Sequence, residues 1–149
     1  MTTRLLLATV FLCGIVVNAH AQAARLFVGG PLFVTEDATS IFCSIHNAGA
    51  AIQPPLENMH LVDENNNRLE DSTTCSPGVP LNPGNSCSIS VQNNVQGIVG
   101  RLITCTVLAT PAAAGGPAIL SGTVDVREEE SQELLYVIPL QPTTVIPFQ

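Results

Sequence analysis

Apolar and polar residues alternate along several short stretches of this chain, and turn residues separate those stretches. In residues 39–46 the apolar face carries Ile41 and Cys43, because successive side chains of a strand point to opposite sides of a sheet. Residues 86–91 and 100–109 repeat the pattern, and each places a cysteine on its apolar face. This period of two predicts antiparallel strands with one buried face.

The whole pattern predicts an all-β antiparallel sandwich of about seven to eight strands, without βαβ units. A Gly29-Gly30-Pro31 interruption marks the first strand as an edge strand that bends or switches sheets. The last stretch is expected to form one more edge strand, but a short helix over 129–135 is the rival expectation, since Glu, Gln and Leu are good helix formers. The expected strands are 26–34, 39–46, 57–63, 68–76, 86–91, 100–109, 118–127 and 134–138.

Composition supports this fold class. Hydrophobic residues make up 46% of the chain but aromatics only 4%, with no Trp, so the core must consist mainly of Val, Ile, Leu and Ala. Branched side chains favour strands, and 11 Gly with 11 Pro supply turns and interrupt helices.

The charge is sparse and one-sided, with 12 acidic residues, five Arg, no Lys and a formal net charge of −7. A surface that binds phosphates needs clustered Lys or Arg. Here the arginines beyond the first residues are scattered singly, at Arg25, Arg68, Arg101 and Arg127. We therefore expect neither a nucleic-acid partner nor binding to an anionic membrane surface.

The first 21 residues have the features of a signal peptide: Arg4, an apolar run over 5–17, and the cleavage pattern Ala19-His20-Ala21. Cleavage after Ala23 and an uncleaved anchor are the alternatives. The apolar run is short for a membrane span, and no later stretch is long enough for one. We expect a secreted or periplasmic protein.

The expected division of the chain is a signal peptide (1–21), a β-sandwich domain (22–127) and a tail (128–149). The tail begins with three glutamates, which predict a solvated turn. It continues with an apolar stretch interrupted by Pro139, Pro142 and Pro147. Such a stretch could offer an apolar edge to another strand.

Four of the five cysteines lie beyond the leader, and in an exported chain four cysteines imply two disulfides with three possible connectivities. Cys43 and Cys105 both point inward from long apolar strands. Cys75 and Cys87 flank a turn-rich segment between neighbouring short strands. We therefore expect the pairs Cys43–Cys105 and Cys75–Cys87.

A cysteine on the second strand paired with one on the penultimate strand resembles the immunoglobulin-like β-sandwich module of bacterial secreted proteins, over most of residues 26–127. The chain departs from antibody-type domains because it has no Trp, and because Ile103 stands where they carry a Tyr. The resemblance concerns architecture and implies no ligand.

No cofactor and no metal are expected. The cysteines lack close C-x-x-C spacing, and His46 and His60 are not arranged as paired ligands. The run Asp63-x-Asn65-x-Asn67 opens like a calcium loop, yet the Gly and the bidentate Glu that such a loop requires are replaced by Arg and Thr. It predicts a hairpin loop, with a surface calcium site as the alternative.

No catalytic constellation is apparent. Gly84-Asn85-Ser86-Cys87-Ser88 differs from the G-x-S-x-G pattern at its last position, and the adjacent carboxylates Glu70-Asp71 would face opposite sides of a strand. We expect a noncatalytic module that binds a protein or cell-envelope partner through loops or an edge strand. The alternatives are a structural protein and a carbohydrate-binding or adhesin-like module, for which the aromatics available are Phe27, Phe33, Phe42, Tyr136 and Phe148.

Overall fold

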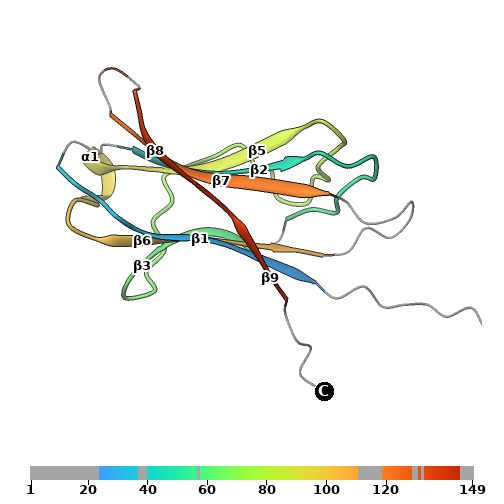
Figure 1. The fold of residues 1–149 in the computed structure, drawn as a ribbon, viewed down its shortest axis with the longest axis horizontal. Coiled ribbons are helices and arrows are strands. Elements are labelled where there is room, and N and C mark those ends of the chain that lie inside the picture. Colours follow the sequence, from blue (N-terminus) through green and yellow to red (C-terminus); the bar gives the residue numbers. More distant parts are fainter. Residues whose placement is uncertain are drawn as a thin grey trace, which may run out of the picture.

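The computed structural model describes residues 24–36, 40–56, 58–110, 119–128, 131 and 133–144. These residues form nine strands and one short helix, and the strands make two antiparallel sheets that lie face to face (Figure 1). The expected all-β fold is confirmed. The expected signal peptide, residues 1–21, lies outside the described residues. Within the described ranges no helix is long and apolar enough to cross a membrane.

One sheet has four strands and the other has five. The order in the first sheet is β3 (Asn58–Asp63), β6 (Leu102–Ala109), β1 (Arg25–Phe33) and β9 (Gln141–Thr144). The order in the second is β4 (Ser72–Thr73), β5 (Ser86–Gln92), β2 (Ser40–Asn47), β7 (Leu120–Arg127) and β8 (Leu134–Pro139).

The inward faces of the two sheets form one core, and the expected alternation places the right residues there. On β2 and β6 every second side chain is fully buried, including Ile41, Ile45, Ile103 and Val107. Burial of several branched aliphatic side chains, each worth about 1.5–3 kcal/mol, supplies the main stabilising free energy.

The expectation for the first strand was wrong. β1 lies between β6 and β9 and stays in one sheet. Its register shifts between Gly29 and Leu32, so the chain gains one residue there and both Phe27 and Leu32 remain buried. The interruption is therefore an irregularity that keeps the apolar face turned inward, and the strand continues without switching sheets.

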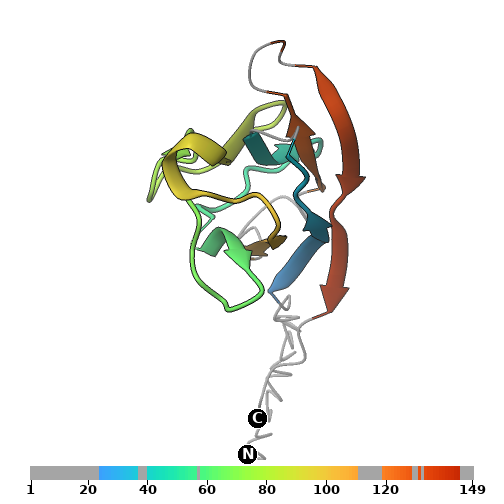
Figure 2. The ribbon, with the colours of Figure 1, turned by 90° about the vertical axis from the view of Figure 1, so that its left-hand side faces the viewer.

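The chain switches sheets at its other end. β8 pairs with β7 in the five-stranded sheet, and one residue later β9 pairs with β1 in the other sheet. In Figure 2 this pair of strands runs down one side of the sandwich, from one sheet to the other. Residues 134–144 of the expected tail are thus part of both sheets. The edge strand expected at 134–138 is confirmed, and the rival helix is wrong because β8 begins at Leu134.

Leu140 lies at the crossover between β8 and β9 and is buried. Its N–H donates to the carbonyl of Gly122 at 2.8 Å. A Cβ atom on Gly122 would come within 2.5 Å of the Leu140 side chain, and a Cβ on Gly29 would do the same. The two glycines, one from each sheet, therefore leave the space that Leu140 occupies.

The continuous strand expected over 68–76 is divided. β4 has two residues, and the segment before it forms one bridge, between Val62 and Arg68. Backbone bonds from Asp71 to Ser90 and from Thr74 to Ser88 flank β4. Side chains add to them: Asp71 accepts from the N–H of Gln92, and the N–H of Ser88 donates to the Thr74 hydroxyl. Short polar side chains commonly compete with the backbone in this way.

The helix α1 (Asn93–Gln96) was not expected from the sequence. It ends at Gly97, which has a left-handed backbone conformation with φ of 59°. The Asn93 side chain accepts the N–H of Ile98 at 3.0 Å. Four residues are too few to give a recognisable helical period.

Candidate functional site

The four cysteines lie in the two expected pairs, Cys43–Cys105 and Cys75–Cys87. The first pair is fully buried and connects β2 of one sheet to β6 of the other, with Cα atoms 6.1 Å apart. The second pair is half-buried and closes the turn between β4 and β5. Both pairs are placed to stabilise the sandwich.

The run Asp63-x-Asn65-x-Asn67 forms a hairpin loop, as expected. One oxygen of the Asp63 carboxylate accepts the backbone N–H groups of Asn65 and Asn67, at 2.9 and 2.8 Å. The other accepts from the Asn67 side chain and from Arg101, at 2.9 and 3.1 Å. The hydrogen bond from the Asn67 side chain leads the interactions that lower the pKa of Asp63 below its ordinary value, and the backbone bonds and Arg101 add to it. Both carboxylate oxygens thus serve the fold.

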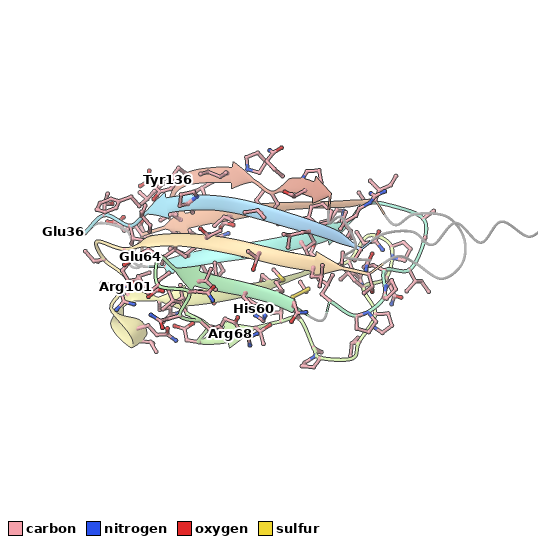
Figure 3. All side chains as sticks on the ribbon, turned by 90° about the horizontal axis from the view of Figure 1, so that it is seen from below. Glu36, His60, Glu64, Arg68, Arg101 and Tyr136 are labelled. Atoms are coloured by element: carbon pink, nitrogen blue, oxygen red, sulfur yellow. A yellow bond between two sulfur atoms is a disulfide. The ribbon has the colours of Figure 1, made fainter. Side chains whose placement is uncertain are left out.

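His60 connects β3 to the segment that returns beside it, a cluster seen from below in Figure 3. Its Nδ1 lies 2.8 Å from a Glu70 carboxylate oxygen, and its Nε2 contacts the Arg68 guanidinium. A carboxylate can only accept and a guanidinium can only donate, so the contacts fit a neutral imidazole protonated at Nδ1. Neither ring nitrogen is left for another ligand.

The second histidine, His46, makes a contact that no sequence motif predicts. His46 Nδ1 lies 2.9 Å from the Ser86 hydroxyl on the neighbouring strand, because the β2–β5 register places the two residues opposite one another. Ser86 also lines a cavity of about 160 Å³ beside Cys75 and Cys87. In the described part of the chain no carboxylate is seen to orient His46, so the pair lacks the third group of a catalytic triad.

No metal centre appears in the part of the chain that the structure describes, where His, Cys, Asp and Glu nowhere gather in threes. The aromatic side chains do not all gather at one surface. Phe27 is buried, and Phe42 lies beneath the guanidinium of Arg127. Phe33 is 58% exposed on the other sheet, where its carbonyl accepts the Tyr136 hydroxyl. Phe148 lies outside the described residues. Of the described aromatic residues, Phe33 and Tyr136 are therefore neighbours, and Phe27 and Phe42 do not join them in a shared stacking platform for a sugar.

The most distinctive surface is the outer edge of β8, which we call the β8 edge. Among the described residues it is the last strand of its sheet, and none of them pairs with the outer side of its backbone. Three of its six residues are large, apolar and exposed: Leu134 (52%), Leu135 (39%) and Val137 (44%). An exposed apolar strand edge can pair with another polypeptide strand.

The register with β7 shows which backbone groups face outward. Leu140 donates to Gly122, and antiparallel partners alternate between bonded and non-bonded pairs. Ile138 and Tyr136 therefore face β7, whereas Val137 and Pro139 turn their backbone groups outward. Since proline has no N–H, Val137 presents both a donor and an acceptor, and Pro139 presents an acceptor alone.

Tyr136 fixes β8 to the opposite sheet. Its hydroxyl donates to the carbonyl of Phe33 at 2.9 Å, on the part of β1 that β9 does not reach. Partial burial raises the pKa of the Tyr136 hydroxyl above its ordinary value. The strand is thereby held on its inner side while its outer side stays open.

The exposed edge follows from the sequence only in part. The sequence predicts an apolar edge strand in the tail. It does not predict that the backbone N–H and C=O of Val137 face outward, because that depends on the register with β7. Comparisons of the chain with protein-family models, curated proteins and solved structures found no match. The geometry of the β8 edge is thus the basis for a functional assignment.

Proposed function

We propose that this protein is an exported, noncatalytic module with an immunoglobulin-like sandwich that binds an extended segment of a partner protein along the β8 edge. The carrying observation is that β8 combines an unpaired backbone with exposed apolar side chains. Addition of a strand to a sheet edge is a common mode of peptide recognition. Backbone hydrogen bonds supply affinity, and alternate side chains supply specificity.

The immunoglobulin-like assignment is supported by the position of the Cys43–Cys105 pair. It joins the second strand of the chain to a strand of the facing sheet, as the bridge of immunoglobulin domains does. Export is supported by the leader pattern in residues 1–21 and by two cysteine pairs at disulfide distance, since disulfides persist in oxidising compartments.

The β8 edge is suited to a peptide because its ends are defined. Pro139 removes the outward donor at one end, and the charged Glu133 precedes Leu134 at the other. A bound segment would exchange two backbone hydrogen bonds with Val137, one donated and one accepted by Val137, each contributing about 0.5–1.5 kcal/mol net. Contact with the exposed leucines would add apolar burial at about 25 cal/mol per Å².

The test is a selection of displayed ten-residue random peptides on the exported protein. Bound peptides are then compared on the wild type and on V137P. The substitution removes the outward N–H of Val137 without removing a hydrogen bond to β7. We expect the selected peptides to be apolar and extended, and to bind V137P at least about tenfold more weakly.

V137T is the matched control, because threonine is also branched at Cβ and retains the backbone N–H. It should bind the selected peptides nearly as well as the wild type. The urea midpoint of each variant establishes that it is folded. Equal binding of every selected peptide to folded V137P and to the wild type would contradict the proposal.

A further inference from the structure

We infer that the strand accepted at the β8 edge is β8 of a second copy of this chain, paired antiparallel about a two-fold axis at Val137. The inference rests on the proposed function and names the partner of the same edge. The resulting dimer joins two five-stranded sheets into one continuous sheet. A two-fold contact of this kind is isologous, so one surface must complement itself.

The backbone favours this register. Within β8, Val137 presents an outward donor together with an outward acceptor, as the alternation from the Leu140–Gly122 hydrogen bond shows. Placing the axis at Val137 makes the two valines a bonded pair that exchanges two hydrogen bonds. The missing N–H of Pro139 then lies at the end of the shared ladder, where it costs least.

The side chains are complementary in the same register. The exposed Leu135 of each copy lies opposite the exposed Pro139 of the other, and Leu134 lies near the partner's crossover at Leu140. The register of β8 against β7 shifts between Tyr136 and Leu134, so the regular part of the contact covers residues 136–138, and Leu135 meets Pro139 at each end of it. Neighbouring cross-strand pairs of this type each contribute modestly to sheet stability.

Charge selects the antiparallel orientation. Glu133 lies directly before β8, and its carbonyl accepts the N–H of Glu128. In the antiparallel arrangement Glu133 lies beside the uncharged Gln141 of the partner. A parallel arrangement would place the Glu133 residues of the two copies side by side, where like charges repel. The uncharged end of β8 is thus the better neighbour for Glu133.

Two features limit the strength of the dimer. The edge of a six-residue strand is small compared with the interfaces of stable complexes. Each copy also carries a formal net charge of −7, so the copies repel one another at long range. We therefore expect a weak, concentration-dependent dimer that salt strengthens by screening. A basic heterologous partner would show the opposite dependence on salt.

The test is analytical ultracentrifugation of the exported protein over a range of concentrations, at low and at high salt. The wild type and V137T should dimerise, more strongly at high salt. V137P should associate at least about tenfold more weakly than the wild type. V137K should remain monomeric, because the two introduced ammonium groups would face one another across the axis.

A wild type that stays monomeric at every concentration, or a V137P that dimerises as well as the wild type, would overturn the inference. The peptide selection separates the two proposals. If the chain is monomeric but selected peptides distinguish V137P from the wild type, the self-pairing inference fails and the proposed function stands. If neither assay distinguishes the variants, both fail.

Discussion

The two edges of the five-stranded sheet differ sharply. At one edge, β4 has two exposed polar residues, Ser72 and Thr73. The Cys75–Cys87 pair and side-chain hydrogen bonds to β5 hold its surroundings in place. At the other edge, β8 has six residues and exposes three large apolar side chains. Proteins usually keep edge strands short or polar, or place prolines and bulges on them, to prevent unwanted pairing. β8 has Pro139 and a register shift, but it is longer than β4 and exposes apolar side chains.

The four-stranded sheet supports the same contrast. Its edge strand β3 is covered by the returning segment, where the N–H of Leu69 donates to the carbonyl of Leu61. Its other edge, β9, has four residues and includes Pro142. Among the strands that the structure describes, β8 therefore has the long, uncovered apolar edge, and we attribute it to binding.

The largest effect is expected when the anchor of β8 is removed. L140A should lower the free energy of unfolding by about 2–5 kcal/mol, because it leaves a cavity between Gly29 and Gly122. Urea denaturation measures this loss, and Q141A, at the exposed next position, is the matched control. The comparison predicts that the amides of β8 and β9 lose exchange protection first, ahead of those of β5. Uniform loss across both sheets would contradict a local anchoring role.

A somewhat smaller effect is expected at the β4 edge. Replacement of both Cys75 and Cys87 by serine opens a loop with a sequence separation of 12 residues. On the chain-entropy model this lowers the free energy of unfolding by about 3 kcal/mol.

Binding at the β8 edge should survive this replacement, since the two edges are separated by three strands. Peptide binding by the double variant, measured well below its urea midpoint, tests the independence of the two edges. Loss of binding in the folded variant would show that they are coupled.

A pH-dependent effect is expected at the hairpin that covers β3. The folded-state pKa of Asp63 is lowered, so its contribution to stability is present above the ordinary value of 3.8 and is lost as the pH falls through the lowered pKa. D63N should flatten the decrease in urea midpoint over that acidic range. A D63N profile parallel to that of the wild type would exclude this role, and E64Q is the neighbouring control.

Local patterns predicted much of the fold. The alternation of apolar residues placed Cys43 and Cys105 on inward faces, and the structure pairs them across the two sheets. The tail strand was also foreseen. The features that the sequence did not predict depend on residues far away in the chain. The crossover at Leu140, for example, is recognised only when its side chain is seen to pack against Gly29 of β1 and Gly122 of β7.

The candidate site shows the same limit. Exposed apolar residues and Pro139 can be read from the sequence, and a proline in a strand is typical of an edge. The outward donor of Val137 depends on which strand lies beside β8 and in what register. The divided strand at 68–76 also depends on distant partners, since the side chains of Asp71 and Thr74 bond to the backbone of β5.

The most direct test of an open β8 edge is amide hydrogen exchange at Val137, measured from low to high protein concentration and with a selected peptide. We predict that the Val137 amide exchanges freely in the monomer and becomes protected as strands are added. The amides of Tyr136 and Ile138, which face β7, should stay protected throughout. A Val137 amide already protected in the dilute protein, or unprotected under every condition, would contradict the account.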